Sequence, residues 1–292
     1  MLTSNIFINS KFKNKMKKLL FFLLISAFGY SQKISGDIKF KSEKSEIEKL
    51  DISSKNIYYK YTFTFDKENK DKKRSTITVL QVGKNISKFT DVNLLKYDSL
   101  FDIKNQNEFI YTNDLNELMP IRKAIKFNKL IIKNNDKYTF QGKVYNKSYE
   151  FIDKLPALSW QLQSGNKVIL GYNCKEATLN YAGRKWVAYY TEDIPLNDGP
   201  FLFNGLPGLI LEIFDDKKEH YFVAEAIDNI PNSIYIHKER KIIKTSRNEF
   251  YKAEMNFHKN PELYVEKVYS SPGVEDTSFI HKELPYNPIE LK

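Results

Sequence analysis

The chain of 292 residues contains a single cysteine, Cys174. One cysteine cannot close an intrachain disulfide, so the folded state has to be stabilised by its hydrophobic core. A catalytic cysteine needs a thiol pKa lowered by a helix N-terminus or an adjacent cation, and nothing in the sequence places either beside this residue. We therefore expect Cys174 to be a small buried apolar residue, which is the usual role of a free cysteine.

Histidine is also scarce, and the four histidines are His220, His237, His258 and His281. None of them has the spacing to another histidine or to the cysteine that a metal site requires. The chain lacks an HExxH helix, a GxSxG nucleophile elbow, a protein-kinase signature and a dinucleotide-binding glycine motif. These absences argue against the common classes of enzyme, and we expect no metal and no cofactor.

Long apolar segments are absent as well. The run Leu19–Phe28 has about half of the roughly 20 residues that span a bilayer. Five lysines precede it, and Gly29 and Ser31 occupy the −3 and −1 positions before Gln32, which is the order of a secretory signal peptide. A buried core helix is the alternative, but the flanking charges and small residues favour export.

We therefore expect residues 1–31 to be cleaved, leaving a mature chain without an integral membrane span. Met16 begins a complete signal of its own, so the two candidate translation starts are Met1 and Met16. No cysteine follows the apolar run closely, so a lipoprotein is not expected. The expected localisation is the periplasm or the extracellular space.

Acidic residues are outnumbered, since 46 lysines and arginines oppose 36 aspartates and glutamates. Half of the formal net charge of +10 leaves with the five lysines of the expected signal peptide. Charged runs such as residues 66–74 mix both signs and are typical of solvated loops. The chain has no basic stripe and no aromatic-basic recognition module, so nucleic-acid binding is not expected.

Aromatic residues are abundant, with 19 tyrosines and 21 phenylalanines that often alternate with polar residues, as in half-buried strands. Residues 56–65 and 74–82 predict a long hairpin, and residues 92–102 predict a helix capped by Asp91. Further strands are predicted at residues 137–145, 149–153, 158–163, 167–172, 175–182, 184–191, 208–214 and 220–227.

The remaining segments predict short helices and an irregular tail. Residues 108–129 are ambiguous and have room for a second helix, and a capping box at Ser246 precedes a third. Residues 260–262 offer an N-cap and a first-turn proline for a fourth. We predict a mainly β protein, an antiparallel curved sheet, open barrel or sandwich with a few short helices, in one domain over residues 32–292.

Residues 172–213, YNCKEATLNYAGRKWVAYYTEDIPLNDGPFLFNGLPGLILEI, resemble the signature of the GLPGLI family of exported proteins of Gram-negative bacteria. The terminal YNPIEL and the early segment YYKYTFTFD are similar to the usual end and first strand of such proteins. The resemblance implies export, a β-rich fold and a single-domain layout, and it supplies no catalytic residues. The motif itself comprises Gly205, Leu206, Pro207, Gly208, Leu209 and Ile210.

The GLPG segment predicts a turn. Pro207 fixes φ near −65° and Gly208 can adopt a positive φ, which is the combination of a type II turn. A phosphate-binding glycine loop is the functional alternative, but such a loop leads into a helix, whereas this turn leads into the apolar strand 209–214. We expect the motif to begin a central strand.

Glu212 is the only polar residue of that strand. We expect it to share a face with Ile210 and Phe214, where a buried carboxylate has to be paired. Arg184 and Lys185 of the neighbouring strand are the expected partners. A paired structural carboxylate is one interpretation, and an acid or base in a site is the other.

The candidate binding residues are Arg184, Trp186, Tyr190 and Glu212. An exposed arginine and aromatic rings beside a proline- and glycine-containing loop are suited to a peptide, a glycan or a lipid headgroup. Trp186, Ala188 and Tyr190 also alternate as one face of a packed strand, which is the competing interpretation.

Three functions remain open. The first is an exported, non-catalytic envelope protein that binds an apolar or peptide ligand, a lipid or an outer-membrane protein partner. The second is a hydrolase that uses Cys174 or carboxylates such as Glu212 and Asp193. The third is a structural or assembly partner of an envelope protein. A buried cysteine and a neutralised Glu212 would argue against the second, and a fully packed interior would argue against the first.

Overall fold

A computed structural model of the chain describes residues 36–291, apart from 37, 43–45, 239–240 and 265–282. The predicted signal peptide and the first part of the predicted irregular tail, up to residue 282, lie outside the described residues. In the part of the chain that the structure describes, no helix combines the length and apolarity needed to cross a bilayer.

Twelve strands form one open sheet. In chain order they are β3 (Lys55–Thr64), β4 (Lys73–Val82), β5 (Ile86–Asp91), β7 (Lys129–Asn134), β8 (Lys137–Val144), β9 (Lys147–Lys154), β10 (Gln161–Ile169), β11 (Tyr172–Tyr181), β12 (Arg184–Thr191), β13 (Leu209–Asp215), β14 (His220–Asp228) and β16 (Ile243–Lys244). Their order in the sheet is β10-β11-β12-β13-β14-β3-β4-β5-β7-β8-β9-β16.

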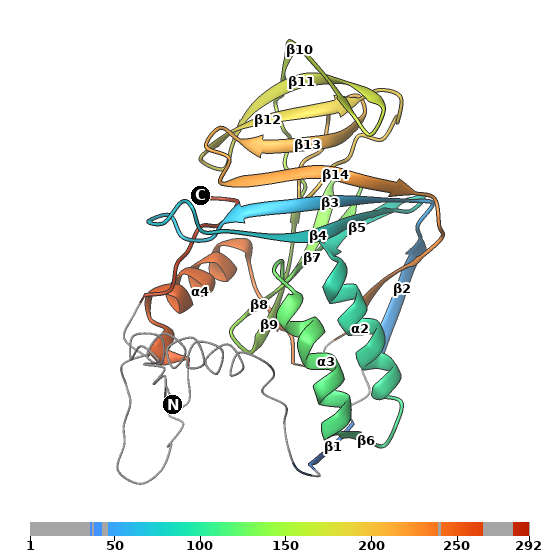
Figure 1. Cartoon of the computed structure of the whole chain (residues 1–292), viewed down its shortest axis with the longest axis vertical. Coiled ribbons are helices and arrows are strands. Elements are labelled where there is room, and N and C mark those ends of the chain that lie inside the picture. The colour runs from blue at the N-terminus through green and yellow to red at the C-terminus, as the bar shows by residue number, and fades with distance from the viewer. Residues whose placement is uncertain (1–35, 37, 43–45, 239–240, 265–282, 292) are drawn as a thin grey trace, which may run out of the picture.

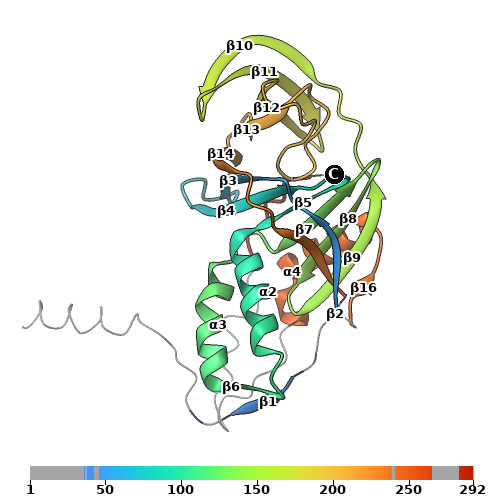
Figure 2. The same ribbon diagram turned by 90° about the vertical axis from the view of Figure 1, so that its right-hand side faces the viewer.

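All pairings in this sheet are antiparallel except the short β16–β9 pair, and Figure 2 shows that the β10 end of the sheet is strongly curved. The predicted fold class, a mainly β protein with a curved antiparallel sheet and a few short helices, is confirmed.

Two ribbons and several helices complete the described part of the chain (Figure 1). The ribbons pair β1 (Lys39–Lys41) with β6 (Phe109–Tyr111), and β2 (Glu46–Ile52) with β15 (Ser233–Lys238). The helices are α2 (Val92–Lys104), α3 (Thr112–Ala124), α4 (Arg247–Lys259) and a 3-10 turn at Pro261–Leu263. The sequence analysis did not predict either ribbon, and β2 is almost wholly exposed and carries no clear strand pattern.

Local signals placed the hairpin and two helices correctly. Strands β3 and β4 pair from Lys55 opposite Val82 to Thr64 opposite Lys73. The α2 N-cap is Asp91, whose side chain accepts a hydrogen bond from the Asn93 amide at 2.8 Å. The predicted capping residue of α4, Ser246, accepts one from the Glu249 amide at 3.3 Å.

The bounds of two predicted strands were wrong. The two strands predicted at 158–163 and 167–172 form one strand, β10, with a register shift between Leu162 and Asn166. Trp160 precedes this strand and donates to the carbonyl of Asn204 at 2.8 Å, so it anchors a loop instead of extending a ladder. The helix predicted to begin at residues 260–262 starts as the 3-10 turn Pro261–Leu263, and its predicted continuation lies outside the described residues.

The lower half of the sheet is covered on both faces. Phe250 of α4 packs on Phe140 of β8 and Phe151 of β9, with ring centroids 5.0 and 5.9 Å apart. The opposite face of β7 carries Ile132, which packs against Ile236 of β15. Figure 2 shows this layering, with α4 behind the lower strands and the β2–β15 ribbon and α2 in front of them.

The upper half of the sheet is filled by the connection between β12 and β13. Phe201, Phe203 and Leu206 of this connection are almost completely buried. Phe203 packs on Trp186 of β12, with ring centroids 4.6 Å apart. The segment from Gly199 to Phe214 is therefore mostly core, since burying apolar area on this scale is the main driving force of folding.

Candidate functional site

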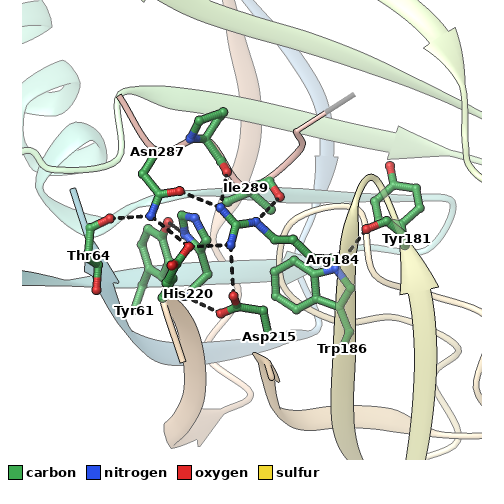
Figure 3. Close-up of polar contacts among 11 residues, drawn as sticks. Tyr61, Thr64, Tyr181, Arg184, Trp186, Asp215, His220, Asn287 and Ile289 are labelled. Atoms are coloured by element: carbon green, nitrogen blue, oxygen red, sulfur yellow. Dashed lines mark hydrogen bonds and ion pairs between the residues drawn. The ribbon is translucent and has the colours of Figure 1, made fainter. Parts of the chain in front are cut away.

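Arg184 is the centre of a buried polar network (Figure 3). Its guanidinium donates to Asp215 at 2.9 Å and to Glu219 at 2.8 Å, and only 7% of the residue is exposed. Burial raises the pKa of Asp215 despite the arginine. Burial also acts to raise the pKa of Glu219, but the hydrogen bond and charge of Arg184 outweigh it and leave that pKa below its ordinary value.

The same guanidinium holds the C-terminal segment. It donates to the Asn287 side chain at 2.6 Å and to the carbonyls of Pro288 and Ile289 at 2.9 and 3.1 Å. Asn287 in turn donates to the carbonyl of Thr64 at 2.7 Å. The terminal YNPIEL segment is thus an internal strap, in which all hydrogen-bonding capacity of Arg184 is used by the protein itself.

His220 lies beside this network. Its Nδ1 is 2.8 Å from the hydroxyl of Tyr61, and its backbone amide donates to Asp215 at 2.7 Å. Burial lowers its pKa well below the ordinary value, and the charge of Arg184 acts in the same direction. A neutral, enclosed imidazole of this kind is part of the core, not an exposed acid or base.

The GLPG turn differs from the predicted type II turn. The Gly208 amide donates to the carbonyl of Leu206 at 2.8 Å, so the turn is centred on Pro207 alone. Gly208 has φ of +157°, and a Cβ built on it would lie 2.6 Å from the carbonyl carbon of Thr191. Leu209 donates to the carbonyl of Ile194, and this pairing pulls the chain close to the end of β12.

The sequence predicted that Glu212 pairs with Arg184 or Lys185, and this prediction was wrong. Its carboxylate contacts the Lys167 ammonium of β10 and accepts a hydrogen bond from the Tyr221 hydroxyl at 2.6 Å. A register shift places Glu212 opposite Tyr189 and Ile210 opposite Tyr190, so Glu212 does not share a face with Ile210. The extra residue of this bulge is what the strict alternation of the prediction missed.

Cys174 is buried, with 2% of its surface exposed. Its thiol donates a hydrogen bond to the carbonyl of Tyr172 at 3.5 Å, and burial raises the pKa of the thiol to about 11. A nucleophilic cysteine requires the opposite shift. His220, the nearest histidine in sequence, forms its Nδ1 hydrogen bond with the Tyr61 hydroxyl instead.

The four candidate binding residues are buried and are not gathered into one site, because Arg184 and Tyr190 lie at opposite ends of β12 and Glu212 is on the Tyr189 face of the sheet, opposite to Tyr190. Trp186 and Tyr190 are 0% and 1% exposed, and Glu212 is 2% exposed. Trp186 donates its indole N–H to the carbonyl of Tyr181 at 3.2 Å. The expectation of an exposed arginine with aromatic rings was therefore wrong, and the packed-strand alternative holds. The curled sheet and the connection that follows β12 enclose Arg184, Trp186 and Tyr190.

A hollow lined by apolar and ionisable side chains lies elsewhere. A cleft of about 490 Å³ separates the β2–β15 ribbon from the outer face of β7, β8 and β9, and we call it the ribbon cleft. Its apolar lining residues are Leu50, Ile132, Ile152, Ile236 and Ile242. Its polar lining residues are Glu48, Thr139, Gln141, Glu150, His237, Lys238 and Lys244.

A cluster of ionisable groups ties the ribbon to the body next to this cleft. His237 of β15 lies 3.0 Å from a carboxylate oxygen of Asp102 and 3.8 Å from one of Asp98, both on α2. Burial raises the pKa of Asp98 to about 6, although His237 and Lys88 act to lower it. Lys88, whose pKa burial lowers to about 8, donates to the carbonyl of Tyr235 at 2.8 Å.

This cluster has the perturbed pKa values that often mark functional sites, but its contacts connect β15 to α2. Both ring nitrogens of His237 face carboxylates, so neither is directed at a ligand as a general base requires. Across the described residues, no group of three or more histidine, cysteine, aspartate or glutamate side chains is arranged to hold a metal ion. The His237 contacts hold the β2–β15 ribbon in place, and the ribbon cleft beneath it is suited to binding a ligand.

Sequence reasoning missed the ribbon cleft because its walls come from distant segments. Glu48, Gln141 and His237 are separated by roughly a hundred residues each in the chain. A weak signal was available in SIYIHK at residues 233–238, whose alternation is that of a strand. Nothing in the sequence identified its partner strand.

Comparison with known proteins finds a protein family and several solved structures. A family described as "Protein of unknown function (Porph_ging)" matches residues 182–212, which span β12, the connection after it and the first residues of β13. No curated protein matches the chain by sequence.

Two crystal structures of PNGF-II, in space groups C2 and P21, resemble the fold with TM-scores of 0.46 and 0.45 at 14% sequence identity. The alignments cover 72% of this chain and 34% of PNGF-II, so the matched part is about a third of that protein. By sequence, the chain is similar to an uncharacterised family over the segment that holds Arg184 and the GLPG turn.

Proposed function

We propose that this chain is an exported, non-catalytic binding protein of the cell envelope that holds an apolar ligand in the ribbon cleft. The GLPGLI resemblance, with which the match at residues 182–212 is consistent, supports the exported assignment. The observation that carries the binding assignment is the cleft itself. Its volume of about 490 Å³ lies within the range of roughly 300 to 1,000 Å³ typical of ligand sites.

The lining of the cleft supports the ligand class. Ile132 and Ile236 are nearly buried in its floor, whereas Ile152 is 67% exposed at its open side. Glu150 contacts Lys244 and accepts from Gln141 at 2.7 Å, so the charges of this wall are compensated by the protein. An apolar chain is the ligand that such a site favours, and the chain of a lipid or an apolar peptide segment meets this description.

The test is to secrete the protein in a Gram-negative host, purify it under native conditions and identify retained molecules by mass spectrometry. Thr139 faces the cleft beside Ile132 and Ile152, so Thr139→Trp fills it. The wild type is expected to retain a lipid or an apolar peptide. Thr139→Trp is expected to retain at most about 10% of that amount, because the indole ring occupies the volume that the ligand would fill.

Ile52→Ser is the matched control, because Ile52 lies on the same ribbon, is 64% exposed and does not line the cleft. It should retain the ligand at the wild-type level. Retention that is equal in the filled variant, or absent from the wild type, would contradict the proposal.

A role as an assembly partner is the second candidate, and the edge strand β10 favours it. Among the described strands β10 pairs with β11 alone, and it exposes 63% of Leu162 and 65% of Val168. Exposed apolar edges are common docking positions for other chains. Cross-linking in envelope preparations should trap a complex that the paired variant Leu162→Lys and Val168→Lys abolishes, and persistence of the complex would exclude this edge.

A further inference from the structure

A second hollow lies between α2 and the β3–β4 hairpin, and we call it the α2 groove. It has a volume of about 400 Å³ and apolar walls formed by Tyr58, Val79, Leu95, Leu100 and Ile103. It shares no lining residue with the ribbon cleft. It is therefore a separate site, and the ribbon-cleft assignment does not depend on it.

Helix α2 covers the hairpin incompletely. None of its thirteen residues is fully buried, although seven of them are apolar, and Ile103 is 58% exposed. Val79 on the facing sheet is 2% exposed. The groove thus exists because the helix stands off the sheet, leaving apolar side chains without the contacts that a packed interior supplies.

The groove also contains an unpaired acceptor. Gln81 is 4% exposed, and its Oε1 is buried without a hydrogen-bond partner among the described residues. A buried acceptor without a donor is costly, and native structures contain few of them.

The neighbours of Gln81 do not satisfy it. Its cross-strand partners are Asn56 and Lys88. Asn56 donates to Asp228 at 2.6 Å and to the carbonyl of Ile230 at 2.8 Å, and Lys88 donates to the carbonyl of Tyr235. Asn56 thus uses both of its side-chain N–H groups elsewhere, and no hydrogen bond joins Lys88 to Gln81, so a donor group on a molecule in the groove would satisfy this acceptor.

We propose that the α2 groove binds a small neutral amphiphile, with an apolar body between α2 and the hairpin and an O–H or N–H group that donates to Gln81 Oε1. The ligand is neutral because the unpaired atom accepts a proton donor and the surrounding wall is apolar. Lys96 is the one charged residue of the lining, and it is exposed at the rim.

N-phenyl-1-naphthylamine tests this assignment, because its fluorescence rises in apolar sites and it carries one N–H donor. The matched probe 1-phenoxynaphthalene has the same shape and no donor. The wild type should bind the amine about fivefold more tightly than the ether, which is the value of one neutral hydrogen bond. Gln81→Leu, which keeps the side-chain volume and removes the acceptor, should bind both probes alike.

Filling variants locate the probe. Leu100→Trp narrows the α2 groove and should abolish binding of both probes, whereas Thr139→Trp fills the ribbon cleft and should leave their affinities unchanged. Circular dichroism establishes that each variant is folded. Three results would overturn the proposal: no binding to the wild type, loss of binding in Thr139→Trp in place of Leu100→Trp, or an amine preference that survives Gln81→Leu.

Discussion

Lys167 and Glu212 form an ion pair, although their strands, β10 and β13, are separated in the sheet by β11 and β12. Adjacent strands lie about 4.8 Å apart, so a flat sheet would place these backbones about 14 Å from each other. The contact therefore reports strong curvature at this end of the sheet, which Figure 2 shows as the arch of β10 over its neighbours.

Replacing Lys167 tests how far this pair stabilises the curl. The Glu212 side chain is 3% exposed and that of Lys167 is 44% exposed, so Lys167→Met leaves a buried carboxylate with Tyr221 alone. We expect the free energy of unfolding in urea to fall by about 2 kcal/mol, less than for a fully buried pair because the lysine is half exposed. The double variant Lys167→Met with Glu212→Gln should recover most of the loss, and equal losses in the single and double variants would contradict the coupling.

Arg184 is expected to be among the most sensitive positions of the chain. Arg184→Met leaves Asp215 and Glu219 without their cation and frees the C-terminal strap, so we expect a loss of about 3 to 5 kcal/mol in urea unfolding. Lys185→Met is the matched control on the exposed side of the same strand, with an expected change within about 0.5 kcal/mol. A similar cost at both positions would show that the network is not what stabilises this region.

Gly208 is required for the close approach of the GLPG turn to β12. Gly208→Ala places a methyl group against the carbonyl of Thr191, and we expect a loss of about 3 kcal/mol or more, measured by thermal and urea unfolding. Gly171→Ala is the comparison, because Gly171 has φ of +83° but open space where its Cβ would lie. That variant should cost only about 1 kcal/mol, the strain of a left-handed residue. The idea fails if the two glycines are equally tolerant.

Asp98 should make stability depend on pH between about 4 and 6. Its pKa is raised in the folded state to about 6 from 3.8, mainly by burial, so the folded state binds its proton more tightly. The stabilisation is present below pH 4 and is lost as the pH rises through 6. Asp98→Asn removes this loss, so its advantage over the wild type should grow by about 2 kcal/mol between pH 4 and pH 7.

Urea unfolding of both proteins at the two pH values measures this difference. His220, whose depressed pKa weakens the fold as the pH falls, is present in both proteins and cancels in the comparison. An advantage that is the same at pH 4 and pH 7 would show that Asp98 is not the titrating group.

Cys174 is expected to be unreactive in the folded protein. Its thiol is buried and has a pKa of about 11, so reaction with a disulfide reagent at pH 8 should be at least about a hundredfold slower than in denaturant. Cys174→Ser should leave ligand retention in the ribbon cleft unchanged. Rapid native labelling would instead support the hydrolase hypothesis.

Local sequence was sufficient wherever the interacting residues are close in the chain. The β3–β4 hairpin, the Asp91 cap of α2 and the Ser246 cap of α4 follow from alternation and capping chemistry within a few residues. The apolar strand after the GLPG turn was also identified as central, and β13 lies between β12 and β14. These features depend on backbone geometry and short-range hydrogen bonds, which the sequence alone determines.

Tertiary structure decided everything that depends on distant partners. Glu212 contacts Lys167, 45 residues away in the chain, because the sheet curls. Arg184 donates to the carbonyl of Ile289, 105 residues away, because the C-terminal segment returns to β12. The ribbon cleft and the α2 groove arise from how elements of ordinary sequence are placed against one face of the sheet. Alternation gives a residue's face only until a bulge shifts it, and the choice among possible partners is made by packing of the whole chain.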